Sequence, residues 1–570
     1  MIFFCFIFGL IALNRICISF HAYEFDSYGK TRANRNCKVK NATIPISWEK
    51  LKKYKLWPHL TNEDTYKSGR ALYGSQYAIK MIWKHQHPSS CSDKKFFVSG
   101  GFRSGFGSVI HVESTVFGLA MEIDRIYLSH PKGAIRAGLR DNTWQIDNDY
   151  CKYLNKDNME CYFEPWSSCS YKDAIKLVQG KDYDKLPRLH LSQFKDASRE
   201  SLIKSVKEWA SKHNDEKVIV IEHTDEELMV NRFIPTSVYP IVMCSPMKQN
   251  FEYYWWRAVT STYVMRPNND TIYAFHYYNN HTYNSSPDHN NNTVSNQTEA
   301  ERDKMVLARP HLDHILTRLA VPTNPGQYIR SSSPDLNAGF TSRDRCVGMY
   351  VRHGDKGGEM KLLPVNKYLE VASFLYRHNL SIGNDESVEE RERLKKLLAG
   401  NDSSTGALND THHIQTTNFN HIFIGTENPD VIREAMEWGK KNSINVFYTD
   451  LFDRSLVSAR LDQKEMSKVR FQCNGGYTMV VRAGGRSQCV RQHPLEYLSM
   501  IINLFYMIKC DAWVCTLQSN WCRLVDELRA TVGGKANRYF ADLSEGTCAS
   551  PPCLVDGIYA YEWRRLQGNQ

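Results

Sequence analysis

A regular alternation of short apolar runs and amphipathic segments fills the chain from about residue 346 to residue 531. Runs such as CVGMYV, HIFIGT, NVFYT and AWVCT have the composition and length of buried strands. The segments between and after them have helical spacing; PDVIREAMEWGKK, for example, follows an N-cap residue, Asn428, and starts with Pro429. This alternation predicts a parallel sheet, with ligands at the carboxyl ends of its strands.

A second pattern of the same kind opens the first half of the chain. Residues 96–128 predict a strand, a Gly-rich turn (GGFRSGFG), a helix and a strand, and KVIVIEH (217–223) predicts a further buried strand. A chain of 570 residues exceeds one ordinary core. We therefore expect an α/β protein with two main domains, at 96–340 and 341–548. A helical stem at 23–95 precedes them, and a short tail at 549–570 follows.

Two polar segments interrupt these domains. Residues 268–296 are rich in Asn, Ser and His, which predicts a glycosylated surface loop, an insertion over about 266–300, rather than a core element. A second polar insertion is expected at about 381–418.

The N-terminus predicts entry into the secretory pathway. The apolar run from Ile2 to Leu13 has the length of a signal-peptide h-region, and Cys17 and Ser19 offer small residues for cleavage. No basic residue precedes the run, so residues 1–22 are read either as a cleaved signal peptide or as a short uncleaved anchor that tolerates Arg15.

Cysteine and glycosylation patterns agree with that compartment. Of 16 cysteines, those after the leader are even in number and lack paired zinc-type spacing, which favours disulfides. They cluster in short pairs such as Cys161/Cys169, Cys515/Cys522 and Cys548/Cys553. N-glycosylation acceptors occur at Asn41, Asn269, Asn280, Asn284, Asn291, Asn296, Asn379, Asn401 and Asn409. The net charge of +10 suits anionic ligands, but without a long basic block it predicts no nucleic-acid partner and no membrane contact beyond the possible anchor.

Polar residues follow several of the predicted strands. They are Arg352, His353 and Lys356 after CVGMYV, Glu427 and Asn428 after HIFIGT, and Ser519, which can cap the helix after AWVCT. The Gly-rich turn lies between a strand and a helix, where backbone N–H groups can face a phosphate. Because several strand ends offer anion or sugar contacts, we expect a nucleotide-diphosphate site.

The order of these motifs resembles the GDP-fucose-dependent fucosyltransferases, and most closely the α-1,6-fucosyltransferases that modify N-glycan cores. The resemblance rests on Gly-Phe-Gly with His111, Tyr-Val-Arg-His-Gly-Asp-Lys, Gly-Thr-Glu-Asn-Pro and Val-Cys-Thr-x-x-Ser-x-x-Cys-Arg. The family motif His-x-Arg-Arg-Thr-Asp-Lys falls on residues 350–356, with His353 in place of the second arginine. The resemblance is not expected to extend to the C-terminal SH3-like domain or to most of the N-terminal coiled coil of the N-glycan-core enzymes.

The resemblance implies a GT-B arrangement of two Rossmann-like domains and inverting transfer of fucose from GDP-fucose, with no metal or other cofactor. The acceptor would be a glycan or glycoprotein in the Golgi lumen, for an enzyme that is anchored, soluble or secreted. Donor contacts carried over from the family are Gly105, Phe106, Gly107, His111, Arg352, His353, Asp355, Glu427, Asn428, Asn503 and Ser519, and Cys515 with Cys522 would form a disulfide.

The transfer chemistry assigns roles to the charged residues. Without a metal, Arg352 and Lys356 would stabilise the departing diphosphate, and Asp355 would orient them. A carboxylate must take the proton of the acceptor hydroxyl, and Glu359 is the candidate base, with Asp355 as the alternative.

Other interpretations stay open. Asp147 and Asp149 form an Asp-x-Asp triplet of the kind that a metal-dependent transferase would need. Replacement of charged family residues by His353, Asn428 and Asn503 also fits an inactive relative that binds a GDP-sugar or carbohydrate, and another GDP-sugar could be the donor. Trp255 and Trp256 are expected in the core, and His111 is either a packed or a site residue.

Overall fold

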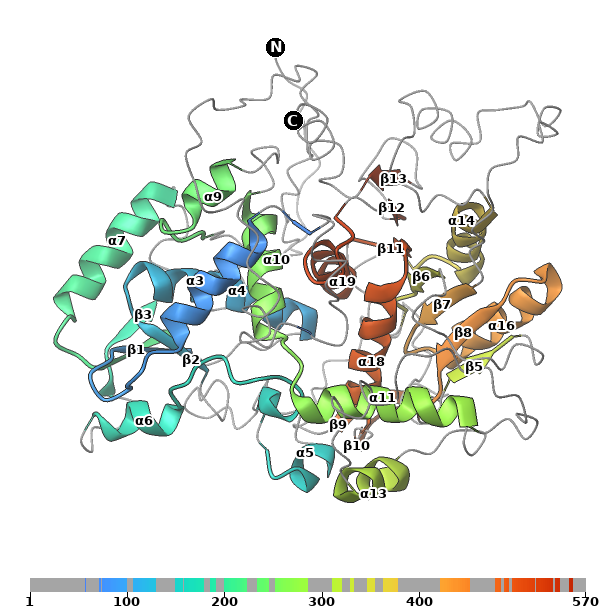
Figure 1. Ribbon diagram of the computed structural model, residues 1–570, viewed down its shortest axis with the longest axis horizontal. Helices are drawn as coiled ribbons and strands as arrows, with labels where there is room; N and C mark the ends of the chain where they lie inside the picture. The colour runs from blue at the N-terminus through green and yellow to red at the C-terminus, as the bar shows by residue number, and fades with distance from the viewer. Residues whose placement is uncertain are drawn as a thin grey trace, which may run out of the picture.

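The computed structural model gives the arrangement of the helices and strands (Figure 1). The described residues are 57, 71–72, 74–99, 106–129, 149–156, 158–178, 185–190, 199–222, 233–244, 252–284, 310–319, 329–332, 346–353, 362–377, 421–451, 477–482, 486–491, 495–517, 519–536, 539–543 and 553–556.

The second half of the chain forms a 7-stranded sheet in the order β13-β12-β11-β6-β7-β8-β5. Its central strands are parallel: β6 (Cys346–Tyr350), β7 (His421–Gly425), β8 (Val446–Thr449), β11 (Ala512–Cys515) and β12 (Tyr539–Asp542). Strands β5 (Ile329–Ser331) and β13 (Cys553–Asp556) add antiparallel edges. The strands expected from the apolar runs are confirmed, and β13 lies in the segment expected as a tail.

Numbered in chain order, the parallel strands of this sheet lie in the order 3-2-1-4-5, that of a doubly wound Rossmann sheet. The helices predicted between and after them are present: α14 (Val365–Arg377), α16 (Pro429–Asn442), α18 (Glu496–Lys509) and α19 (Asn520–Ala530). Asn428 caps α16 as predicted and accepts a hydrogen bond from the Asp430 backbone N–H. A separate hairpin pairs β9 (Tyr477–Arg482) with β10 (Arg486–Arg491).

The first half forms a parallel 4-stranded sheet in the order β2-β1-β4-β3. The strands are β1 (Phe96–Ser99), β2 (Ile126–Ser129), β3 (Arg188–His190) and β4 (Val218–Glu222). Helix α4 (Phe106–Glu122) connects β1 to β2, and α7 (Arg199–Lys212) connects β3 to β4. The α/β class with two parallel sheets is therefore confirmed by the strand pairing.

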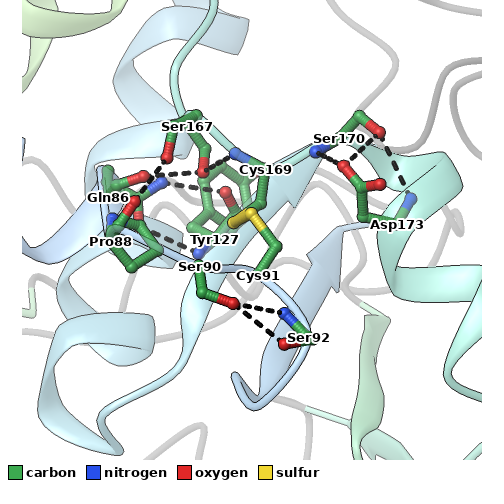
Figure 2. Close-up of a disulfide and its surroundings, with 11 residues drawn as sticks. Gln86, Pro88, Ser90, Cys91, Ser92, Tyr127, Ser167, Cys169, Ser170 and Asp173 are labelled. Carbon is green, nitrogen blue, oxygen red and sulfur yellow. Dashed lines mark hydrogen bonds between the residues drawn. A yellow bond between two sulfur atoms is a disulfide. The ribbon is translucent and has the colours of Figure 1, made fainter.

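Helix α3 (Ser75–Gln86), within the region expected as a stem, packs on this first sheet. The Gln86 amide donates to the Tyr127 carbonyl and accepts from the Tyr127 N–H, so it pairs with the open edge of β2 as a neighbouring strand would (Figure 2). The Cys91–Cys169 disulfide ties the segment after α3 to the turn before α6 (Tyr171–Lys176).

The two units share one hydrophobic core, which includes residues of α4, α18 and α19. Helix α10 (Glu252–Val264) packs against α3, α4 and α19 at the centre of the molecule (Figure 1). Trp255 and Trp256 on α10 are fully buried, which confirms the prediction of a core position. The described part of the first half also contains α5 (Asp149–Tyr153), η1 (Asn158–Cys161), α9 (Tyr239–Cys244) and α13 (Pro310–Leu319).

The prediction of a surface loop after residue 268 was wrong for its first part. Residues 269–284 form helix α11 (Asn269–Asn284), with Tyr273, Phe275 and Tyr278 buried. Aromatic residues at helical spacing form the buried face, whereas the Asn and His residues between them hid this periodicity in the sequence.

Disulfides join neighbouring elements in both units. Cys515 and Cys522 are paired, as predicted. Cys161 and Cys169 are not paired with each other; the bonds are Cys151–Cys161, Cys91–Cys169 and Cys346–Cys510. Among the described residues, no helix combines the length and hydrophobicity needed to cross a membrane.

Candidate functional site

The strand order of the second sheet reverses between β6 and β11. Strand β6 has β7 on one side and β11 on the other, so the connections that follow these two strands lead away in opposite directions. In doubly wound sheets ligands bind at the carboxyl edge beside such a reversal. That edge is where Arg352 follows β6 and Ser519 precedes α19.

Arg352 is held at this edge by a carboxylate. Its Nη1 donates to Glu427, which follows β7, and the Tyr350 hydroxyl donates to the other Glu427 oxygen at 3.0 Å. The Arg352 and Glu427 side chains are 22% and 26% exposed, so both remain accessible to a solute. An anionic ligand can therefore compete with Glu427 for the guanidinium.

Neighbouring predicted residues make local structural bonds. His353 Nε2 lies 2.7 Å from the Leu363 carbonyl, and Asn428 caps α16. Asn503 is buried on α18 and accepts a hydrogen bond from Thr449 at 2.7 Å. These side chains are close to strand ends, but their bonds in the structure are to the protein.

The first turn of α19 meets the first turn of α4 from the other unit. A Cβ on Gly107 would lie 2.9 Å from the backbone of Asn520, so this approach requires glycine. Asn520 Nδ2 donates to the Ser108 hydroxyl at 2.6 Å, and the Phe106 ring lies edge-on to the Trp521 ring. The first turn of α4, which carries the last glycine of the Gly-rich segment, and the start of α19 are thereby brought together.

Buried hydroxyls also face this edge. Thr516, directly after β11, and Tyr368, on α14, are fully buried neighbours. Neither hydroxyl has a hydrogen-bond partner of ordinary geometry in the described part of the chain. Burial raises the pKa of Tyr368 to about 12, so its phenol stays protonated and able to donate.

Ser519 is in the N-cap position but is 1% exposed, and its side chain makes no capping bond. The Cys515–Cys522 disulfide joins the end of β11 to the first turn of α19, which fixes where this helix starts. The turn between them is closed by the Leu517 N–H, which donates to Asp542 at 2.9 Å.

A buried ionic cluster lies behind this site. It joins His111 of α4, a predicted site residue that the structure buries, to Arg257 of α10 and Glu527 of α19, which the sequence analysis missed. Glu527 is fully buried; one carboxylate oxygen pairs with Arg257 and with His111, and the other accepts from Ser261 at 2.9 Å. Burial opposes the charge, yet Arg257 and His111 hold the pKa of Glu527 below its ordinary value.

The adjacent Asp526 behaves differently. Burial raises its pKa to about 6, although the Tyr254 hydroxyl donates to it and partly offsets the shift. The acidic pair in WCRLVDELRA suggests an exposed helix face, and only the packing of α19 against α10 places it inside. Neither residue gave a sequence signal beyond this pairing of acids.

Several predicted residues cannot be placed. Gly105, Asp355, Lys356 and Glu359 lie outside the described residues, as does Asp147 of the Asp-x-Asp triplet. Within the described ranges, no group of three or more His, Cys, Asp or Glu side chains is arranged to hold a metal ion. The roles assigned to these residues stay predictions.

No protein-family model matches the sequence, and no curated protein matches it. Among solved structures, the chain is similar to FUT1 of Arabidopsis thaliana in complex with GDP, with 11% identity, a TM-score of 0.33 and coverage of 90% of this chain and 83% of that one. POFUT1 in complex with GDP-fucose gives 10% identity, a TM-score of 0.31 and coverage of 78% and 97%. The fucosyltransferase NodZ from Bradyrhizobium gives 9% identity, a TM-score of 0.30 and coverage of 81% of this chain and 99% of that one. These TM-scores are well below 0.5, so the account of the site rests on this chain's own strand order and contacts.

Proposed function

We propose that the chain is a glycosyltransferase that moves L-fucose from GDP-fucose to a hydroxyl of a glycan or glycoprotein, with inversion and without a metal, in the Golgi lumen. The observation that carries the proposal is the switch point of the second sheet. Arg352 lies on one side of this point and the start of α19 on the other, where α19 contacts Gly107 in the first turn of α4. The motif resemblance supplies the identity of the sugar.

The site residues support a donor mode in which the diphosphate takes the place of Glu427 beside Arg352. Bidentate N–H donors of a guanidinium match phosphate oxygens, and their charge stabilises the GDP that leaves. Transfer then breaks the bond between fucose C1 and the phosphate oxygen as the acceptor oxygen bonds to C1. We assign Lys356 to the phosphates and Glu359 to the acceptor proton, with Asp355 as the alternative base.

The rival proposal, an inactive binding protein, draws support from His353, Asn428 and Asn503. These residues replace charged family residues and make structural hydrogen bonds. Turnover separates the two proposals. An enzyme releases GDP from GDP-fucose in the presence of a glycan acceptor, whereas the inactive relative binds the donor and releases none.

Calorimetric titration of GDP, with UDP as the comparison nucleotide, tests the site itself. We expect GDP to bind and Arg352→Ala to weaken it by about 10- to 100-fold, the value of one or two hydrogen bonds to a charged group. Arg433→Ala is the matched control, because Arg433 pairs with Asp430 at an exposed position on α16. Failure of every GDP-sugar to bind, or equal loss in both variants, would overturn the proposal.

A further inference from the structure

The cluster of His111, Arg257 and Glu527 lies directly behind the two helix starts. Each of α4, α10 and α19 contributes one charged group, and the exposed fractions of the side chains are 9% (His111), 14% (Arg257) and 0% (Glu527). A chain of polar contacts leads from it to the site. Glu527 contacts His111, His111 contacts Asn520, and Asn520 binds Ser108 at the start of α4.

The hydrogen bonds of Asn520 define the state of the His111 ring. His111 Nε2 lies 3.3 Å from Glu527 Oε1, and Nδ1 lies 3.3 Å from Asn520 Oδ1, so both ring nitrogens face oxygen acceptors. Arg523 Nη1 donates to the same Asn520 oxygen at 3.3 Å, so turning the amide over would place its NH₂ against a guanidinium. The contact at Nδ1 has hydrogen-bond geometry, and the contact at Nε2 is an ion-pair distance to a carboxylate. A ring that donates at Nδ1 and is attracted to the carboxylate at Nε2 carries a proton on both nitrogens, as only the doubly protonated imidazole does.

We propose that His111 and Glu527 are positioning residues for donor binding: Glu527 holds the doubly protonated His111 ring against Asn520, and this contact keeps the first turn of α19 against the first turn of α4. The inference rests on the proposed function, in which a GDP-sugar binds at the sheet edge between Arg352 and the start of α19. Loss of the ring proton removes one of the two contacts and loosens the α19 start.

The charged groups around the His111 ring set the pH at which it loses this proton. They are Glu527 and Arg523 on α19 and Arg257 on α10, whereas the Tyr253 hydroxyl on α10 donates to the His111 backbone carbonyl. Burial lowers the pKa of His111 below 6.5, and the Glu527 carboxylate offsets part of that shift. GDP affinity should therefore weaken as pH rises through a value below 6.5.

The test is calorimetric titration of GDP into the full chain from pH 5 to pH 8, for the wild type and two variants. His111→Phe keeps an aromatic ring and leaves Glu527 paired with Arg257 and Ser261, so the buried carboxylate retains an opposite charge. We expect His111→Phe to weaken GDP binding about tenfold at the acidic end, as for one lost hydrogen bond to a charged group, and to abolish the pH step. The phosphate groups of GDP also change their protonation over this pH range. Any pH dependence that remains in the variant measures this background.

Tyr254→Phe is the matched control, because it removes a hydrogen bond between the same helices, α10 and α19, without touching His111. We expect its GDP affinity to stay within about twofold of the wild type at each pH, with the same pH step. If the wild type binds GDP and His111→Phe has the same affinity and pH profile, the positioning role is overturned and the proposed function stands. If the wild type binds no GDP at any pH, the proposed function itself fails.

Discussion

Two Arg–Glu pairs in this molecule have the same chemistry and opposite surroundings. Arg352 and Glu427 lie at the carboxyl edge of the second sheet with about a quarter of each side chain exposed. Arg257 and Glu527 lie between α10 and α19, where Glu527 is fully buried and accepts further hydrogen bonds. The first pair is accessible to an incoming anion, and the second is closed to solvent.

This difference separates binding from positioning. A partly exposed ion pair adds little to folding and can exchange one partner for a ligand phosphate. A buried pair must stay complete, because removing one partner leaves an uncompensated charge in a low-dielectric interior. The comparison predicts that equivalent substitutions will act on stability at one pair and on binding at the other.

Glu527→Gln should have the largest effect on stability. It leaves Arg257 buried beside a neutral amide, and we expect a loss of about 3–5 kcal/mol in the free energy of unfolding. Urea unfolding followed by circular dichroism measures it. A loss below about 1 kcal/mol would show that the buried pair is no more important than a surface pair, and would remove the contrast.

Asp526 should give stability a pH dependence. Its pKa is about 6 in the folded protein, against about 3.9 unfolded, so the folded state binds more protons between these values. Its contribution therefore falls by up to about 3 kcal/mol as pH rises from 4 to 6 and is constant above that range. The difference between the wild-type and Asp526→Asn unfolding curves isolates this term, and a difference independent of pH would contradict the burial argument.

Gly107→Ala should disturb the contact between the helix starts. The added Cβ meets the Asn520 backbone at 2.9 Å, and overpacking of this kind costs about 1–3 kcal/mol. We expect GDP affinity to fall as well, because the start of α19 must shift. Ser108→Ala is the control, since it removes one hydrogen bond to Asn520 without adding volume. Wild-type affinity in Gly107→Ala would separate this contact from the donor site.

Glu427→Gln should have the smallest effect on stability. Both partners of its ion pair reach solvent, so we expect a change of about 1 kcal/mol or less in the same urea experiment. A cost close to that of Glu527→Gln would show that Arg352 is fixed structurally instead of being available to a ligand.

The sequence predicted the strand ends of the second sheet well because buried parallel strands are continuous apolar runs. CVGMYV and AWVCT correspond to β6 and β11, and Asn428 with Pro429 marked the start of α16. The prediction was wrong for α11, where Asn and His between the buried aromatics obscured the helical period. The polar composition of this segment therefore predicted a loop, although its aromatic residues have helical spacing.

The ionic cluster could not be predicted from local patterns. Asp526 and Glu527 lie in a helix whose other face is apolar, which indicates a solvated acidic face for an isolated helix. They are buried because α10, from a distant part of the sequence, packs against α19. The disulfide connectivity has the same origin, since Cys161 pairs with Cys151 and Cys169 with Cys91 through tertiary contacts.

Hydrogen–deuterium exchange of the full chain with and without GDP tests the central claim most directly. The account predicts slower exchange on GDP binding in the first turns of α4 and α19 and at Val351–His353, with α7 and α16 unchanged. Bound GDP that slows exchange elsewhere and leaves these three segments unaffected would contradict a donor site at the switch point of the second sheet.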